Sequence, residues 1–149
     1  MSSTNKINSY NFFLKAERTT PQVSIDDQLN EMRFSGRCSP EMVVNFFKPI
    51  EEAIDRYFEQ GKDSLTAHFS LEYINTSSTK GLINLMRRMD KIVAKGKKIE
   101  IYWYYEEDDE DMMETGEDFS DLLMNIEIHI HEFQEGDDID PRNIRTRSA

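Results

Sequence analysis

The chain has 149 residues, of which 38% are hydrophobic and 32% charged, and its formal net charge is −11. This length suits one domain with a real core, and the composition is too apolar for a disordered chain. No run approaches the roughly 20 apolar residues of a transmembrane helix, and the N-terminus lacks a signal-peptide pattern. A single cysteine, Cys38, leaves no internal disulfide to form. We therefore expect one cytoplasmic domain without membrane association.

Acidic residues are concentrated in the C-terminal half of the chain. Of the 29 Asp and Glu residues, 17 lie between Ile99 and Pro141, a stretch that contains no Lys or Arg. An acidic surface repels nucleic-acid phosphates and favours basic proteins or cations. The charge distribution therefore excludes nucleic acid as a partner of this region.

The first part of the chain predicts a short strand and a hairpin. Residues 10–14 are apolar enough for an edge strand, which ends at Thr19-Thr20-Pro21. Residues 23–25 and 29–34 predict two strands joined by the turn-forming residues 26–28. Ser35-Gly36 is expected to end the second strand.

A long amphipathic helix is predicted for residues 40–60. Ser39 is expected at the N-cap and Pro40 at the first helical position, and Gly61 supplies the stop. Pro49 removes a backbone hydrogen bond and clashes with the preceding turn, which predicts a kink or a break near Asn45.

A change of period marks the middle of the chain. Residues 65–73 alternate between apolar and polar, as in a strand with one buried face, whereas apolar residues from Leu82 to Val93 recur at helical spacing. Five polar residues, Asn75 to Thr79, separate the two patterns. The sequence therefore predicts a strand-to-helix turn there, followed by a helix to Lys95.

The remaining elements complete an α/β pattern. Residues 99–105 predict a central strand, the six acids of Glu106 to Asp111 precede a short amphipathic helix, and residues 126–130 predict a last strand. The order hairpin, helix, strand, helix, strand, helix, strand predicts a single-domain mixed β-sheet packed with helices. Residues 1–9 and 134–149 are expected to be flexible, leaving 10–133 as the domain.

The turn from Asn75 to Thr79 has two interpretations. Asn, Ser and Thr side chains satisfy the free amide groups of a helix's first turn, so the run is explained by capping alone. One cap needs one such residue, however, and the other hydroxyls lie where the helix dipole is positive and favours an anion such as phosphate. Lys80 lies within one turn of this cluster, where an ammonium group could meet a phosphate.

Several motifs together resemble the SiaC-type family of bacterial regulatory phosphoproteins, over about Phe13 to Phe133. Met42, where many relatives have Asn, departs from that pattern. The motifs are Tyr73-Ile-Asn-Thr-Ser-Ser-Thr-Lys80, Trp103-Tyr-Tyr105, Asp108-Asp-Glu-Asp-Met112, Gly116-Glu117, Thr20-Pro-Gln-Val23 and Gly36-Arg-Cys-Ser-Pro-Glu41.

The resemblance implies a fold similar to that of anti-sigma-factor antagonists (STAS-like) and a non-enzymatic role in partner switching. It implies phosphorylation at Thr76, with Ser77, Ser78 and Thr79 as less favoured positions. A serine/threonine kinase, a protein phosphatase and a regulated effector, with a diguanylate cyclase as the candidate, are the implied partners. The predicted partner-binding residues are Asn75, Thr76, Ser77, Ser78 and Lys80.

The alternative is a constitutive acidic binding module or a metal-dependent enzyme that uses Glu106–Asp111 with His129 and His131. Two histidines on one strand face beside carboxylates are conceivable zinc or iron ligands. Alternation with three isoleucines already explains the pair as the polar face of an outer strand, and the acid run lacks the spacing of a calcium loop. No nucleophile, nucleotide-binding or metal motif is present, so we predict no catalytic residue, metal or cofactor.

Overall fold

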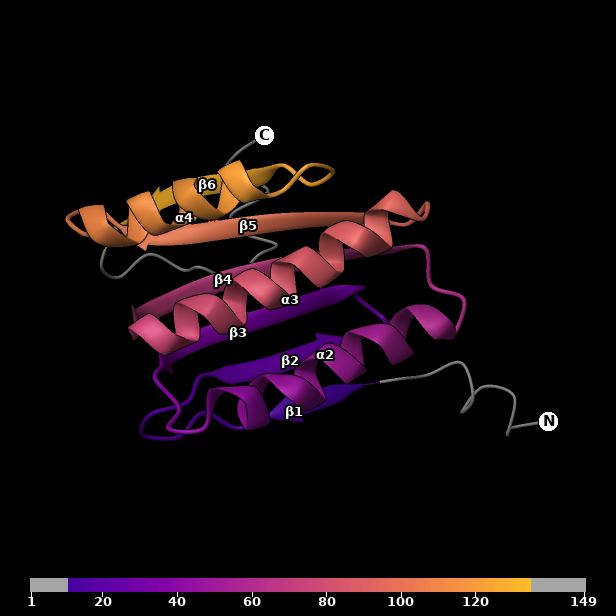
Figure 1. Cartoon of the computed structure of the whole chain (residues 1–149), viewed down its shortest axis with the longest axis horizontal. Helices are drawn as coiled ribbons and strands as arrows, with labels where there is room; N and C mark the ends of the chain where they lie inside the picture. Colours follow the sequence, from indigo (N-terminus) through magenta and orange to yellow (C-terminus); the bar gives the residue numbers. More distant parts are fainter. Residues whose placement is uncertain (1–10, 135–149) are drawn as a thin grey trace.

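A six-stranded sheet carries three helices on one of its faces (Figure 1). The computed structural model describes residues 11–134, so the predicted domain boundaries at residues 9 and 134 stay predictions. This mixed α/β architecture is the predicted one, whereas the similarity to anti-sigma-factor antagonists stays a prediction. The elements are β1 (Phe12–Leu14), β2 (Gln22–Asp26), β3 (Glu31–Cys38), α2 (Val43–Glu59), β4 (Ser64–Ile74), α3 (Thr76–Ala94), β5 (Lys98–Glu106), α4 (Glu110–Leu122) and β6 (Ile128–Phe133).

The strands lie in chain order across the sheet, and the first three are antiparallel. The predicted edge strand and hairpin are confirmed, although Leu29 lies in the turn rather than in the second strand. The prediction that Ser35-Gly36 ends this strand is wrong, because β3 continues to Cys38. Its pairing with β4 shifts by one residue between Gly36 and Arg37, and Gly36 takes a φ of 107° that suits glycine at such an irregularity.

Strands β3, β4, β5 and β6 are parallel, so their carboxyl ends meet at one edge of the sheet. Helices α2, α3 and α4 follow β3, β4 and β5 in turn. The first turns of all three helices therefore lie at the same end of the molecule, at the left of Figure 1. This end contains both the Asn75–Thr79 turn and the acid run.

Helix α2 starts later than the sequence predicts and is not broken. Met42 occupies the N-cap without a side-chain hydrogen bond, while Ser39 binds the carbonyl of Thr19 and lies outside the helix. The helix is continuous through Pro49, so no break occurs there, and the alternative of a kink stays a prediction. Pro49 is exposed, on the side where helix carbonyls tilt outward to water, and the clash with the preceding turn is least there.

The core lies between the helices and the sheet. Val23, Phe34, Phe69 and Trp103 are fully buried on the helix-facing side of the sheet, against the predicted apolar stripes of the helices. Trp103 also holds α4 in place, because its indole Nε1 donates a hydrogen bond of 2.8 Å to the carbonyl of Met112.

The opposite face of the sheet holds a row of rings, and His68 among them belongs to the face of β4 that the alternating pattern predicts as polar. His68 and Tyr104 are only 3% and 1% exposed, and His68 Nδ1 lies 2.8 Å from the Tyr104 hydroxyl. Tyr102 stacks on His68 and on His129, with ring centroids 5.2 and 4.8 Å apart. The rings of this row come from β4, β5 and β6. A polar residue of a central strand, such as His68, is therefore buried by side chains of the strands beside it. Within residues 11–134, no helix is long and apolar enough to cross a membrane.

Candidate functional site

The turn between β4 and α3 has the predicted capped geometry. Asn75 keeps an extended backbone, with φ −81° and ψ 168°, and α3 begins at Thr76. The Asn75 side-chain oxygen accepts a hydrogen bond of 2.9 Å from the amide of Ser78. Asn75 therefore fills the capping role alone, which leaves the four hydroxyl residues after it for other roles.

These four hydroxyls differ sharply in their surroundings. Ser78 is fully buried, and the Thr79 hydroxyl donates to the carbonyl of Asn75 at 3.3 Å. Thr76 and Ser77 are exposed, and no hydrogen bond of either hydroxyl is found among the described residues. An enzyme that transfers or removes a phosphate therefore reaches Thr76 and Ser77 most easily, whereas Thr79 is half-buried and Ser78 is not accessible without local unfolding.

The end of strand β3 contacts this turn. The amide of Asn75 donates a hydrogen bond of 3.2 Å to the carbonyl of Cys38, the last residue of β3. Burial raises the pKa of the Cys38 thiol to about 11, and the neighbouring Ser78 hydroxyl acts in the opposite direction. The thiol is therefore a neutral packing group under the turn and not a reactive one.

Arg37 and Tyr73 lie beside the turn and were not predicted. They pair across β3 and β4, and the Arg37 guanidinium carbon lies 4.6 Å from the centre of the Tyr73 ring. Both side chains are exposed, so this cation–π pair presents a flat surface next to the turn. The alternating strand pattern predicts Tyr73 as a core residue, but Tyr73 is 43% exposed.

A groove of about 680 Å³ begins at Thr76 and runs between α2 and α3. Helix α3 contributes Thr76, Ser77 and Lys80, so the structure brings three of the predicted partner-binding residues together in one place. Asn75 is half-buried in its capping role, and the buried Ser78 cannot contact a partner. The α2 wall of the groove was not predicted; it consists of Val43, Val44, Phe47, Lys48, Glu51 and Glu52.

Two exposed apolar side chains lie at the start of α2, and one of them, Val44, lines this groove. Val44 is 76% and Met42 is 65% exposed, close to the point where α2 begins. Neither residue belongs to the apolar stripe that α2 buries. Apolar residues outside such a stripe are a sequence signal that could have indicated a contact surface here.

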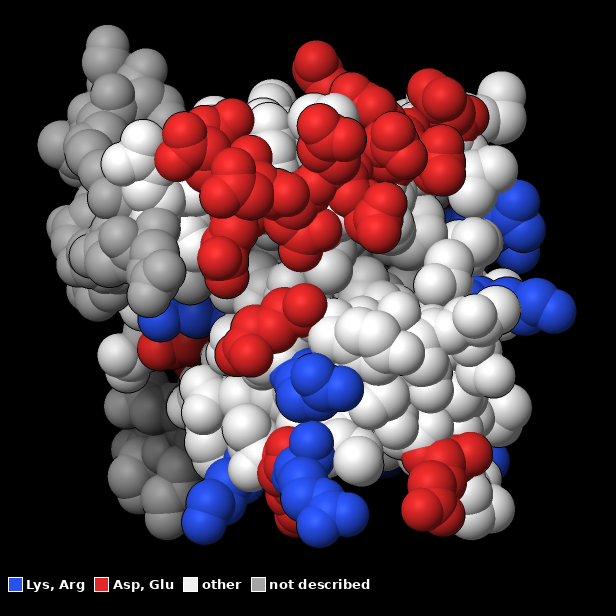
Figure 2. All heavy atoms as spheres, turned by 90° about the vertical axis from the view of Figure 1, so that its left-hand side faces the viewer, with Lys and Arg blue, Asp and Glu red and all other residues white. Residues whose placement is uncertain are grey.

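The acid run lies at the same end of the molecule, at the carboxyl end of β5. Asp109 caps α4 by accepting a hydrogen bond of 3.0 Å from the amide of Met112, and Glu110 and Asp111 occupy the first turn. These acids stabilise the positive end of α4, as the sequence predicts. Figure 2 looks onto this end and shows acidic side chains gathered over one part of it, with most of the visible Lys and Arg outside that part.

The metal-site alternative finds no support in the positions of its residues. His129 and His131 of β6 lie on the face of the sheet that carries Tyr102 of β5, and both of their rings stack on the Tyr102 ring. Burial and the neighbouring His129 lower the pKa of His131. Among the residues that the structure describes, no three His, Cys, Asp or Glu side chains form a group that could hold a metal.

Comparison with solved structures finds the same fold in Pseudomonas aeruginosa. A chain in the crystal structure of the diguanylate cyclase SiaD in complex with its activator SiaC superposes with a TM-score of 0.76 at 21% identity, over 82% of this chain and 99% of that chain. SiaC of Pseudomonas aeruginosa superposes with a TM-score of 0.75 at 19% identity, over 83% of this chain and 99% of that one.

Sequence comparison leads to the same group of proteins. An uncharacterized protein of Pseudomonas aeruginosa strain UCBPP-PA14 is 24% identical over 116 residues, which is 77% of this chain and 92% of that protein. The model of the SiaC family of regulatory phosphoproteins matches residues 14–133. This range contains every described helix and strand except the first two residues of β1. The chain therefore belongs to the SiaC family of regulatory phosphoproteins.

Proposed function

We propose that this protein is a non-enzymatic switch whose binding to an effector is controlled by phosphorylation of Thr76. The observation that carries the proposal is the position of the Thr76 hydroxyl, which is exposed at the rim of the α2–α3 groove, while Ser78 is buried and Thr79 is bonded to the backbone. A phosphate adds a charge of about −1.5 to −2 at this rim, and a bound effector would have to remove water from this strongly solvated group. Unphosphorylated protein binds the effector and phosphorylated protein releases it.

The proposed partners are a serine/threonine kinase, a protein phosphatase and a diguanylate cyclase as effector. The family supports the phosphoprotein role, and the crystal structure of SiaD with its activator SiaC supports a cyclase as the effector. Exposed Val44, which lines the groove together with Thr76, supplies apolar contact area near the modified residue, as a protein interface requires. Both hydroxyls are exposed, and Thr76 is preferred over Ser77 because the resemblance of this motif to the family implies phosphorylation at Thr76.

The test measures binding of this protein to the purified diguanylate cyclase of the same organism that is most similar to SiaD. Thr76→Ala is expected to bind like wild type and to become insensitive to the kinase, whereas Thr76→Asp is expected to bind more weakly. Ser64→Asp, which adds the same charge at an exposed residue near the start of β4, serves as the control and should bind normally. Equal binding by wild type, Thr76→Asp and phosphorylated wild type would show that the turn is only a helix cap.

Mapping of the phosphate is the second part of the test. Intact mass and phosphopeptide analysis of protein from its native host should place one phosphate on Thr76. A phosphate outside Asn75 to Thr79 would contradict the proposal.

A further inference from the structure

Two hollows join to form one long groove along the α2–α3 pair. The hollow that begins at Thr76 shares Glu51, Asn84 and Arg88 with a second hollow of about 960 Å³, which extends as far as Lys95. From Thr76 to Lys95 the helix rises by about 28 Å at the usual 1.5 Å per residue. The groove is therefore as long as α3 itself.

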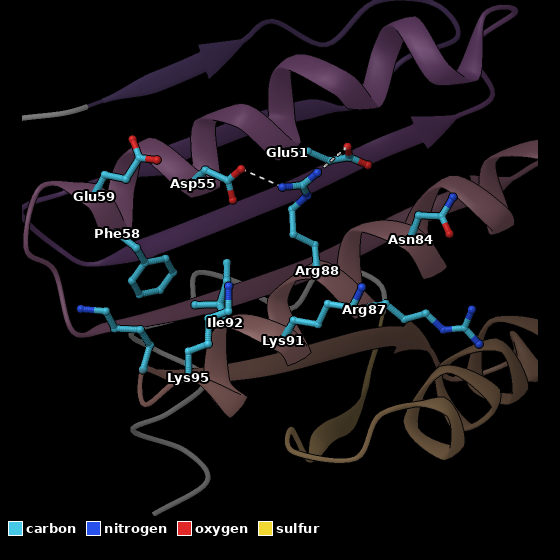
Figure 3. A pocket seen from close by; sticks show the side chains of 11 residues that line it. Glu51, Asp55, Phe58, Glu59, Asn84, Arg87, Arg88, Lys91, Ile92 and Lys95 are labelled. Carbon is cyan, nitrogen blue, oxygen red and sulfur yellow. Dashed lines mark hydrogen bonds and ion pairs between the residues drawn. The ribbon is translucent and has the colours of Figure 1, made fainter.

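The two walls of this groove carry opposite charges (Figure 3). Glu51, Asp55 and Glu59 recur every four residues along α2 and form an acidic wall. Helix α3 presents a basic wall with the same spacing, made of Arg87, Lys91 and Lys95. Residues four apart lie on one face of a helix, so in the hollow that reaches Lys95 each wall has a single sign of charge, whereas Lys48 interrupts the acidic wall near Thr76.

Arg88 connects the walls at the middle of the groove. Its guanidinium lies 2.7 Å from the Asp55 carboxylate and 3.5 Å from that of Glu51. Farther along, the walls are not paired: among residues 11–134, Glu59, Lys91 and Lys95 take part in no ion pair. Their charges remain available to a partner.

The floor of the groove is apolar. Phe58 and Ile92 lie between the charged walls at the far end, and Val43 and Phe47 lie near Thr76. Gly81 allows the close approach of the two helices there, because a Cβ atom at this position would lie 2.4 Å from the Phe47 ring. An apolar floor between two charged walls is the arrangement that binds an amphipathic helix.

We propose that this groove binds one helix of the effector, with a basic flank against α2, an acidic flank against α3 and an apolar stripe on the floor. The inference rests on the proposed function and specifies its partner surface. Nucleic acid does not fit, because the acidic wall repels phosphates. A uniformly charged peptide does not fit either, because one of the two walls would repel it.

Phosphorylation acts at one end of this groove. Thr76 lies at the entrance, and Glu51 and Glu52 lie on the facing wall. A phosphate there adds negative charge at the position where the effector helix enters, and it leaves the Lys91 and Lys95 end unchanged. The modification therefore weakens binding from one end without removing the charge pattern that selects the partner.

The sharpest test exchanges the charges of the two walls. The double variant Glu59→Lys with Lys95→Glu keeps the net charge of the protein but reverses both walls at the far end of the groove. Calorimetric titration with the purified cyclase should show binding weakened by about tenfold or more, as expected for reversed charges that face charged partners. Arg56→Glu, an exposed change on α2 outside the groove, should alter the dissociation constant less than about twofold.

Photo-crosslinking identifies the bound segment. Asn84→Cys introduces an accessible thiol in the middle of the groove, and the native Cys38 is fully buried, so a benzophenone maleimide labels position 84. The crosslinked cyclase peptide should be helical, with Lys or Arg on one flank and Asp or Glu on the other. A crosslink to a segment without this pattern overturns the inference.

The possible failures are distinguishable. If wild type does not bind the cyclase, both the proposed function and this inference fail. If wild type binds and the charge-exchanged variant binds equally, only the groove inference fails. Circular dichroism confirms folding of the double variant, and Glu59→Ala and Lys91→Ala replace it in the titration if it does not fold.

Discussion

At the scale of single residues, Asn75 and Thr76 are adjacent but have separate roles. The Asn75 side chain caps α3 through the Ser78 amide, whereas the Thr76 side chain has no such bond among the described residues. We expect Asn75→Ala to lower the free energy of unfolding by about 1 kcal/mol, the usual cost of a lost N-cap. Thr76→Ala is the matched control and should change it by less than about 0.5 kcal/mol. Urea denaturation of both variants measures the difference, and equal losses would contradict this division of roles.

Cys38 gives a second prediction at this scale, on thiol chemistry. Because burial holds its pKa at about 11, the folded thiol should resist alkylation by iodoacetamide at pH 8 and react only on unfolding. Above pH 9.0, the ordinary value, the unfolded thiol loses its proton while the folded one keeps it, so stability falls as the pH rises from 9 toward 11. Cys38→Ala should show a smaller fall over this range. Alkylation of native protein at the rate of the denatured chain would show that the thiol is accessible.

At the scale of elements, Gly116 determines how closely α4 approaches the sheet. A Cβ atom at this position would lie 2.4 Å from Cδ1 of Trp103. The Trp103 ring is fully buried and is fixed by its hydrogen bond to the Met112 carbonyl. Gly116→Ala should therefore lower the free energy of unfolding by about 1–3 kcal/mol, the usual cost of overpacking, despite the better helix propensity of alanine. Asp118→Ala, at an exposed position of the same helix, should change it by less than about 0.5 kcal/mol. Thermal unfolding followed by Trp103 fluorescence compares the two, and equal stabilities would mean that α4 can shift outward freely.

The elements also show which sequence signals decide structure. Alternation and helical spacing predict β4, α3 and β5 correctly, because each buries a continuous face against the core. The start of α2 is predicted wrongly, because Ser39 has the residue type of an N-cap but its amide and hydroxyl both bind Thr19 instead. A cap preference is worth about 1 kcal/mol, so a contact between segments that are distant in sequence overrides it.

The candidate site was predicted only in part, for a related reason. Thr76 and Lys80 belong to one short segment, so their proximity follows from helix geometry alone. The groove depends on how α2 lies against α3, and no periodicity within either helix contains that information. Arg88 illustrates the point, because its ion pairs with Asp55 and Glu51 join residues more than 30 positions apart.

At the scale of the whole molecule, the surface charges are divided between separate regions, although the core beneath them is continuous. The acid run and α4 lie along one side, and the basic wall of α3 borders the groove, so the negative net charge does not describe the surface that a partner meets. Local charge complementarity controls which partner binds, and net charge controls solubility. The hydrophobic core, in contrast, is continuous, because residues of β2 through β6 and of helices α2, α3 and α4 belong to one buried cluster.

A single core predicts a single unfolding transition. Trp103 is the only tryptophan of the chain, is fully buried in β5 and contacts α4 through its hydrogen bond to Met112 and its packing on Phe119. Its fluorescence therefore reports on the C-terminal part of the fold, while far-UV circular dichroism reports on all helices and strands. In a urea titration the two signals should give the same midpoint and slope, as expected for two-state unfolding of a domain of this size.

Separate midpoints would have a specific structural meaning. Helix α4 and β6 follow β5 in the described part of the chain, and β6 is the edge strand, so the two elements could separate without breaking the pairing of β1 through β5. If the Trp103 signal changed at a lower urea concentration than the dichroism, α4 and β6 would form a less stable unit beside the α2–α3 pair. Gly116→Ala would then lower the midpoint of the fluorescence transition alone, whereas in a two-state protein it lowers both midpoints equally, because the strain that it introduces at Trp103 is carried by the common core.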